Sequence, residues 1–183
     1  MPHTSHYRDS QTRYGSVTRL LHWLMALVLA CQFTSVGAHA LAKDSAFDKF
    51  AWALHKPMGT LLMLLIVIRV LWALMNTGRR PPPVSLLARA GHAALYVLMF
   101  AIPLIALIRQ YGSGRAFSPF GVPLMSGFEG DKIEWMTELG SNFHSELGWV
   151  LLVLALGHIA AAFWHYAAGD KNVMFRIIGK PRP

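Results

Sequence analysis

Four histidines lie within or at the ends of otherwise apolar stretches of the sequence: His22, His55, His144 and His158. A polar ring placed in hydrocarbon without a partner costs several kcal/mol, so each of these residues needs a compensating interaction. Axial ligation of a haem iron provides one, because imidazole is a common ligand of that metal. The pattern therefore predicts haem ligation inside a membrane.

Helical geometry sets the relative heights of these rings. His144 and His158 are 14 residues apart, which in an α-helix corresponds to a rise of about 21 Å and a rotation of about 40°. They therefore share one face, near opposite membrane boundaries. Depth pairs His55, which begins the second apolar stretch, with His144 at the outer boundary. At the inner boundary it pairs His22 with His158, so that two bis-histidine haems are stacked across the bilayer.

Depth alone leaves alternatives open at both boundaries. His92 and His165 also lie near the boundary of His158, and His39 lies near the other one. His165 follows His158 by seven residues on the same helical face, so it could replace His158 as a ligand or line a cavity beside it. The alternative interpretation of all three is a solvated or hydrogen-bonded surface histidine.

Arg69 is a charged residue inside the second apolar stretch. It follows His55 by 14 residues, which brings it to about the depth of His158. A buried guanidinium needs an anion, and the apolar stretches contain no acid in their interiors. A haem propionate could provide the anion through a bidentate contact. The alternative is that the side chain snorkels toward the nearer membrane surface.

The elements that must carry these residues are four apolar stretches, at about 19–38, 55–75, 91–111 and 144–166. Each approaches the ~20 residues that span a hydrocarbon core. Hydrophobic residues make up 54% of the chain and charged residues only 14%, which leaves little for a soluble domain. The stretches lack the alternation of a transmembrane β-strand. We predict an all-α integral membrane four-helix bundle that forms a single domain over residues 1–183.

The formal net charge of +8 is distributed unevenly along the chain. Basic residues gather near both termini and between the second and third stretches: Arg8, Arg13, Arg19, Arg79, Arg80, Arg89, Lys171, Arg176, Lys180 and Arg182. The long connection before the fourth stretch is instead acidic. The positive-inside rule therefore predicts that both termini and the 76–90 connection are cytoplasmic. No basic surface interleaved with aromatic residues remains for nucleic acid.

Cys31 is the only cysteine, so the chain has no internal disulfide and no Cys-x-x-Cys-His motif for covalent haem attachment. Any haem is therefore expected to be b-type. Cleavage of the first stretch as a signal peptide at Ala38-His39-Ala40 is disfavoured, because it would discard His22 and leave three spans.

The connection over residues 112–143 contains two further features. The segment Glu129–Leu139 places apolar residues among acidic ones, which predicts an interfacial amphipathic helix capping the bundle, with a partner-docking site as the alternative. Arg109, Arg115 and Lys132 lie near the outer boundary and could attract an anionic substrate or a propionate, although interfacial anchoring also explains them. The net acidity of this connection argues against strong electrostatic steering.

Several short motifs occur in a characteristic order. They are Leu21-His22-Trp23, His55-Lys56-x-x-Gly59, Ile68-Arg69-Val70-Leu71-Trp72, Gly91-His92-x-x-Leu95-Tyr96, Pro119-Phe120-Gly121, His144 with Gly157-His158, and His165-Tyr166. In their order and spacing these motifs, and nearly the whole chain, resemble the bacterial cytochrome b561 family of four-helix dihaem membrane proteins.

The resemblance implies two haem b groups, one ligated by His22 with His158. The other is ligated by His55 with His144. It further implies electron transfer with quinone in the bacterial inner membrane, and one branch of the family resembles a superoxide oxidase. We therefore expect an oxidoreductase that takes electrons from superoxide, or another small donor, at the outer face and reduces ubiquinone. His165 is a candidate relay for the protons that quinone reduction consumes.

Two other functions are compatible with the same residues. The chain could be the cytochrome b anchor of a larger dehydrogenase or hydrogenase, receiving electrons from a protein partner. It could also be a haem-free polytopic transporter of metal ions or protons that uses the same histidines. A coloured preparation with a reduced α-band distinguishes the haem proteins from the transporter.

Overall fold

The structure is a computed structural model that describes residues 6–179. Lys180 and Arg182, which contribute to the basic C-terminus, lie outside the described residues. Within residues 6–179 the chain is helical, and a single isolated bridge, between Phe117 and Met125, is the only β-type pairing there.

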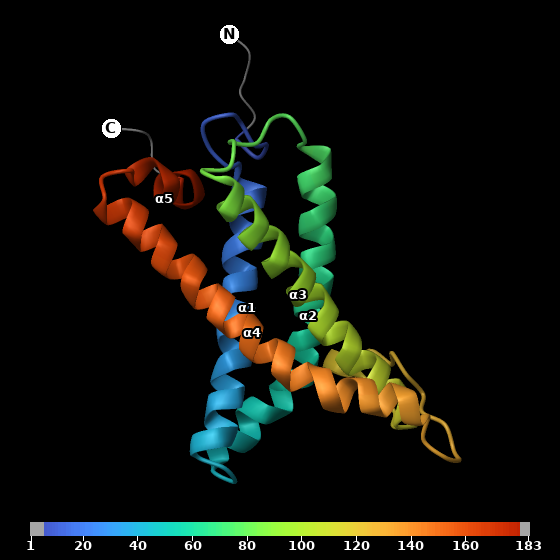
Figure 1. Ribbon diagram of the computed structural model, residues 1–183. Coiled ribbons are helices and arrows are strands. Elements are labelled where there is room, and N and C mark those ends of the chain that lie inside the picture. Colours follow the sequence, from blue (N-terminus) through green and yellow to red (C-terminus); the bar gives the residue numbers. More distant parts are fainter. Residues whose placement is uncertain (1–5, 180–183) are drawn as a thin grey trace.

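Four long helices form the body of the molecule (Figure 1). They are α1 (Ser16–Leu41), α2 (Ala46–Met75), α3 (Leu86–Gly112) and α4 (Glu134–Ala167). Each is long and apolar enough to cross a membrane. The short 3-10 helix η1 (Pro119–Gly121) lies in the long connection, and α5 (Lys171–Ile178) follows α4. The predicted membrane four-helix bundle is therefore confirmed, whereas α5 was not predicted.

All four helices extend beyond the predicted spans. Helix α2 begins at Ala46, nine residues before the predicted span, because the Ser45 hydroxyl caps it by accepting a hydrogen bond of 3.1 Å from the Asp48 backbone N–H. His55 consequently lies inside the helix rather than at its start. Helix α4 also begins before its predicted span, at Glu134 and without a side-chain cap, so His144 lies well within it.

The prediction of a separate interfacial helix over Glu129–Leu139 is wrong. Residues 129–133 are not helical, and Glu134–Leu139 form the first turns of α4. The backbone N–H of Ile133 donates to the carbonyl of Gly112, at 2.9 Å, which ties the end of the connection to the end of α3. This bond directs the chain straight into α4.

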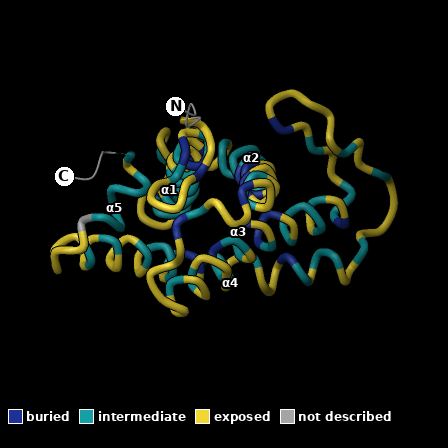
Figure 2. The backbone as a smooth tube through the Cα atoms, turned by 90° about the horizontal axis from the view of Figure 1, so that it is seen from above, coloured by how far each residue is buried: buried dark blue, intermediate teal, exposed yellow. Residues whose placement is uncertain are grey.

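The helices pack as two pairs. Helix α1 lies along α2 and α3 lies along α4, while α2 and α3 share a smaller contact. The core between them contains Met25 of α1, Ile66 of α2, Met99 of α3 and Leu151 of α4. Helix α4 crosses the others obliquely and is the least covered of the four, as the exposed and half-buried colours along it show (Figures 1 and 2). Space is thereby left between α4 and the α1–α2 pair.

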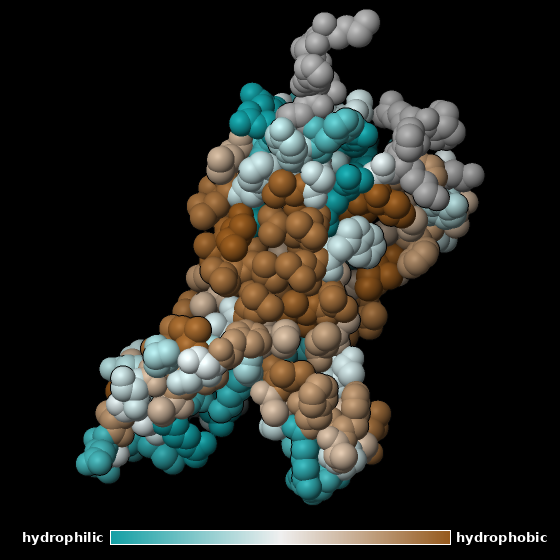
Figure 3. Space-filling model, turned by 180° about the vertical axis from the view of Figure 1, so that it is seen from behind, coloured by the Kyte–Doolittle hydropathy of each residue, from teal (hydrophilic) through white to brown (hydrophobic). Residues whose placement is uncertain are grey.

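The surface is organised as a membrane protein requires. In Figure 3 an apolar belt surrounds the middle of the molecule, and hydrophilic side chains gather at both ends. The 76–85 connection and the two ends of the described chain lie at one end, opposite the α1–α2 turn and the 113–133 connection (Figure 1).

Hydrogen bonds join the three segments that meet at the first of these ends. The backbone N–H of Tyr14 donates to the carbonyl of Arg176, at 3.2 Å. The Arg176 guanidinium in turn donates to the carbonyl of Pro82, at 3.1 Å. The segment before α1, helix α5 and the α2–α3 connection therefore form one continuous surface.

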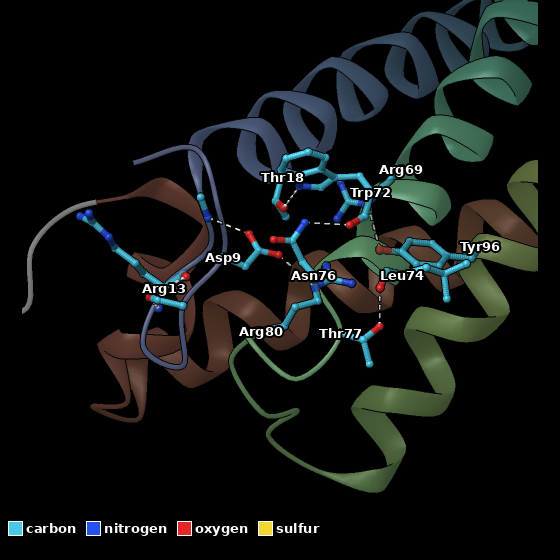
Figure 4. Close-up of polar contacts among 12 residues, drawn as sticks. Asp9, Arg13, Thr18, Arg69, Trp72, Leu74, Asn76, Thr77, Arg80 and Tyr96 are labelled. Atoms are coloured by element: carbon cyan, nitrogen blue, oxygen red, sulfur yellow. Dashed lines mark hydrogen bonds and ion pairs between the residues drawn. The ribbon is translucent and has the colours of Figure 1, made fainter. Parts of the chain in front are cut away.

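A buried carboxylate stabilises the same surface (Figure 4). Asp9 is 4% exposed, accepts a hydrogen bond of 2.8 Å from the Gly15 N–H and forms an ion pair with Arg80, at 3.2 Å. The Arg80 guanidinium also lies over the ring of Tyr14, 5.4 Å from its centroid. Burial raises the pKa of the Tyr14 hydroxyl above its usual value of 10.0, which Arg80 opposes. Sequence reasoning did not identify Asp9, because nothing local in the sequence indicates its partner.

Candidate cofactor sites between the helices

The first histidine pair joins α2 to α4 in the half of the bundle next to the 113–133 connection. The ring centroids of His55 and His144 are 6.2 Å apart, and the ring planes cross at 76°. The two residues come from helices that share little direct packing, and both side chains line the same pocket.

Hydrogen bonds determine which nitrogen each of these rings presents. The Nδ1 of His144 lies 3.2 Å from the carbonyl oxygen of Ile102, which can only accept, so Nδ1 carries the proton. The Ser35 hydroxyl donates to the carbonyl of Gln32 at 2.7 Å and therefore accepts from Nδ1–H of His55, also at 2.7 Å. Both rings thus have an unprotonated Nε2 available for a metal, as in metal sites whose outer hydrogen bonds fix the tautomer.

A cavity of about 900 Å³ lies at this pair and is lined by residues of all four long helices. Its volume is in the range of cofactor and ligand sites. Its mouth corresponds to the hollow between the two arms of the molecule in Figure 3. Arg109, Arg115 and Lys132, which the sequence placed at the outer boundary, line this cavity together with Lys56. Lys56 is held there by a hydrogen bond of 3.0 Å from Nζ to Oε1 of Gln110.

The second pair joins α1 to α4 in the other half of the bundle. The ring centroids of His22 and His158 are 6.3 Å apart, with an angle of 51° between the planes. The Nδ1 atom of His22 is buried and has no hydrogen-bond partner among residues 6–179. No hydrogen bond within residues 6–179 therefore fixes Nδ1 of His22, whose ring meets that of Trp23 edge to face with centroids 5.1 Å apart.

Both spacings fit two imidazoles on opposite sides of one iron. Imidazole–metal bonds of about 2 Å place the centroids of two such rings roughly 6 Å apart. His92, one of the alternatives considered for the inner site, has its centroid 5.2 Å from that of His158, which is shorter than this arrangement requires. His165, the other alternative, lies near the end of α4, and its side chain makes no hydrogen bond, ion pair or ring contact within the described residues.

Arg69 is buried beside the second pair, with 8% of its surface exposed. Its Nε donates to the Tyr96 hydroxyl at 2.8 Å, and the guanidinium lies over the Tyr96 ring, 5.5 Å from the centroid (Figure 4). The Arg69 guanidinium lies within electrostatic range of the His22 and His158 rings. Among residues 6–179 no carboxylate forms an ion pair with Arg69, so its terminal nitrogens are free to bind an anion. Tyr96 was missed as a partner, although its position one turn after His92 could have suggested it.

The chain is similar to known proteins over nearly its whole length. The profile of the family described as prokaryotic cytochrome b561 matches residues 13–180. "Cytochrome b561 homolog 2" of Escherichia coli (strain K12) is 31% identical over 183 residues, which covers 95% of each chain. "Probable superoxide oxidase CybB" of Yersinia pestis is 25% identical over 175 residues, or 93% of this chain and 98% of that protein.

The match extends over nearly the whole chain and includes all four long helices and both histidine pairs. Proteins of this kind bind haem b and transport electrons in the bacterial inner membrane. The chain therefore belongs to the prokaryotic cytochrome b561 family.

Proposed function

We propose that this protein is a dihaem cytochrome that carries electrons through the bilayer to quinone. The observation that carries the proposal is the pair of ring spacings, 6.2 Å for His55 with His144 and 6.3 Å for the second pair, at two levels of one bundle. In this proposal His22 and His158 hold the inner haem b.

Haem b supplies a reversible one-electron iron couple at each site. The chain supplies orientation and charge. Ser35 and the carbonyl of Ile102 hold the outer imidazoles so that Nε2 is directed into the space between them. Arg69 offers a buried positive charge near the inner pair, suited to a propionate carboxylate.

We further propose that the end bearing the termini faces the cytoplasm. The basic residues of the N-terminal segment, the 76–85 connection and α5 gather at that end. The opposite end carries the acidic connection, and the cavity with Arg109, Arg115 and Lys132 opens there. This orientation follows the positive-inside rule and places the cavity on the outer side.

The reaction we propose is the oxidation of superoxide by ubiquinone. Two superoxide ions each lose one electron and leave as O2, and one ubiquinone gains the two electrons and two protons to become ubiquinol. A relative named as a probable superoxide oxidase supports this assignment at 25% identity. The cations that line the outer cavity are suited to a small anionic donor. Protons would come from the cytoplasmic end, where His165 is our proposed relay.

The first test is the absorption spectrum of the purified full chain with a measured haem-to-protein ratio. Two haems per chain and a dithionite-reduced α-band are expected, whereas a colourless preparation would favour the transporter. His55→Ala and His144→Ala should each lose the same single haem. Variants that lose different haems would contradict the pairing.

The second test supplies superoxide and a ubiquinone analogue to the single chain. Quinone reduction in the absence of any other protein supports the oxidase. A dihaem protein that does not reduce the quinone would instead be the electron conduit of a larger complex. In the same assay His165→Ala should retain both haems and slow quinone reduction, while His158→Ala should lose the inner haem. A wild-type rate in His165→Ala would remove His165 from the proton path.

A further inference from the structure

Three aromatic rings are stacked in series at the α1–α2 end of the bundle. The centroids of His39 and Trp52 are 4.1 Å apart with planes inclined by 16°, and those of Trp52 and His55 are 5.1 Å apart with planes inclined by 24°. The indole therefore lies between the two imidazoles with its faces toward both. His39 is the residue that the sequence left as an alternative ligand at this boundary.

The outer end of this stack is fixed by a buried carboxylate. Asp48 is 3% exposed, and its Oδ1 lies 3.0 Å from Nδ1 of His39. Its Oδ2 accepts a hydrogen bond of 2.8 Å from the backbone N–H of Asp44. Both carboxylate oxygens are thus engaged, and the His39 ring is held by its Nδ1–H in a definite plane.

The local sequence explains why these groups meet. Asp48, Trp52 and His55 are spaced by four and then three residues, so they lie on one face of α2. His39 lies in the last turn of α1, and the short connection to α2 brings it against the same face. The array is therefore built entirely by the α1–α2 hairpin and does not depend on α3 or α4.

We propose that Asp48, His39 and Trp52 are positioning residues that hold the plane of the His55 ring, an inference that rests on the proposed haem site. The hydrogen bond to Ser35 restrains His55 at one atom, Nδ1. The face of Trp52 restrains the rotation of the whole ring, and His39, anchored by Asp48, restrains Trp52 from its other side. Asp48, His39 and Trp52 thus form a clamp on His55. Together with the bond that holds His144 to the Ile102 carbonyl, this clamp sets the angle of 76° between the two ring planes.

That angle has a spectroscopic consequence for a ferric iron bound between the two rings. Nearly perpendicular imidazole planes leave two iron d-orbitals almost equal in energy, which gives a low-spin electron paramagnetic resonance signal at unusually large g. Planes that cross less steeply, as for His22 with His158 at 51°, split these orbitals and lower that g value. The outer site therefore reports the His55 ring plane, and the inner site provides an internal reference.

The experiment compares the resonance spectra of the oxidised full-length protein and its Trp52→Leu, Trp52→Phe and His39→Leu variants, after a haem count. In Trp52→Leu the large-g signal should shift and broaden while the inner signal is unchanged, and Trp52→Phe should restore it because a ring face is kept. Loss of the outer haem alone in Trp52→Leu, with recovery in Trp52→Phe, would support the same conclusion.

His39→Leu separates the clamp from a direct effect of Trp52 on the cofactor. Trp52 lines the cavity but His39 does not, so His39→Leu leaves the cavity wall intact. A smaller shift in the same direction is expected. An unchanged large-g signal in His39→Leu, or in Trp52→Leu with both haems present, would overturn the proposal.

The matched control is Trp135→Leu, which removes a comparably exposed tryptophan at the same end that has no ring contact within the described residues. It should leave both signals unchanged, and an equal shift there would overturn the clamp. A wild-type protein without haem would refute the proposed function, whereas two haems with signals insensitive to Trp52 and His39 would refute only the clamp.

Discussion

Replacement of Ser35 by alanine tests whether the outer imidazole is tuned through its Nδ1–H. Ser35 is 2% exposed, and its hydroxyl is the hydrogen-bond partner of His55, at 2.7 Å. Ser35→Ala leaves that N–H buried without an acceptor, at a cost of about 1–3 kcal/mol. Loss of an outer hydrogen bond to a metal-ligating histidine typically weakens metal binding roughly 10- to 100-fold. We expect a loss of outer haem affinity in that range.

The same change should raise the midpoint potential of the outer haem. A hydrogen bond from Nδ1–H increases the basicity of the ligating nitrogen, which stabilises the ferric state. Its removal favours the ferrous state, so the potential moves upward. The inner haem, whose histidines do not contact Ser35, should keep its potential.

Two measurements check this prediction. Transfer of haem to excess apomyoglobin reports affinity at the outer site, and a potentiometric titration followed at the α-band reports both potentials. Ser145→Ala is a matched control, because Ser145 lines the same cavity and its side chain has no hydrogen bond within residues 6–179. Unchanged affinity and potential in Ser35→Ala would show that the Ser35 hydroxyl does not act on the ligand.

Three further predictions concern the end that carries the termini. Arg69→Leu should lower the midpoint potential of the inner haem, because a buried positive charge favours the reduced centre. Tyr96→Phe keeps that charge and should change the potential less, and a redox titration of both variants makes the comparison. Asp9→Ala should lower the free energy of unfolding in detergent by about 3 kcal/mol, because it leaves Arg80 without its buried partner; an unchanged midpoint of thermal unfolding would contradict this. The free energy of unfolding should also fall as the pH rises above 10. Burial raises the pKa of Tyr14 in the folded protein, so the Tyr14 hydroxyl loses its proton first in the unfolded chain. Tyr14→Phe should remove this contribution to the pH dependence in a series of melting curves.

The sequence was sufficient for the features that depend on a single segment. Four continuous apolar stretches predict four membrane helices, because the length and hydrophobicity of a span are local properties. The rise per residue gave the relative heights of His144 and His158 on one helix, and the lack of a Cys-x-x-Cys-His motif indicated haem b. The sequence also predicted that His55 and His144 lie at matching depth, and the structure brings their rings together, with centroids 6.2 Å apart.

Helix boundaries were less accessible, since they depend on hydrogen bonds made outside the apolar stretch. The Ser45 hydroxyl starts α2 nine residues before the predicted span, and the bond between Ile133 and Gly112 precedes a first turn of α4 where an interfacial helix was expected. Both signals are polar contacts that a hydrophobic pattern does not contain.

The tertiary structure alone decided which side chains meet across helices. Periodicity fixes height and azimuth within one helix, but it says nothing of how neighbouring helices are rotated and tilted. For that reason His92 rather than His165 lies against His158, and Arg69 has Tyr96 as its partner. The ion pair of Asp9 with Arg80 likewise joins residues far apart in the chain, and only the packing of the bundle brings them together.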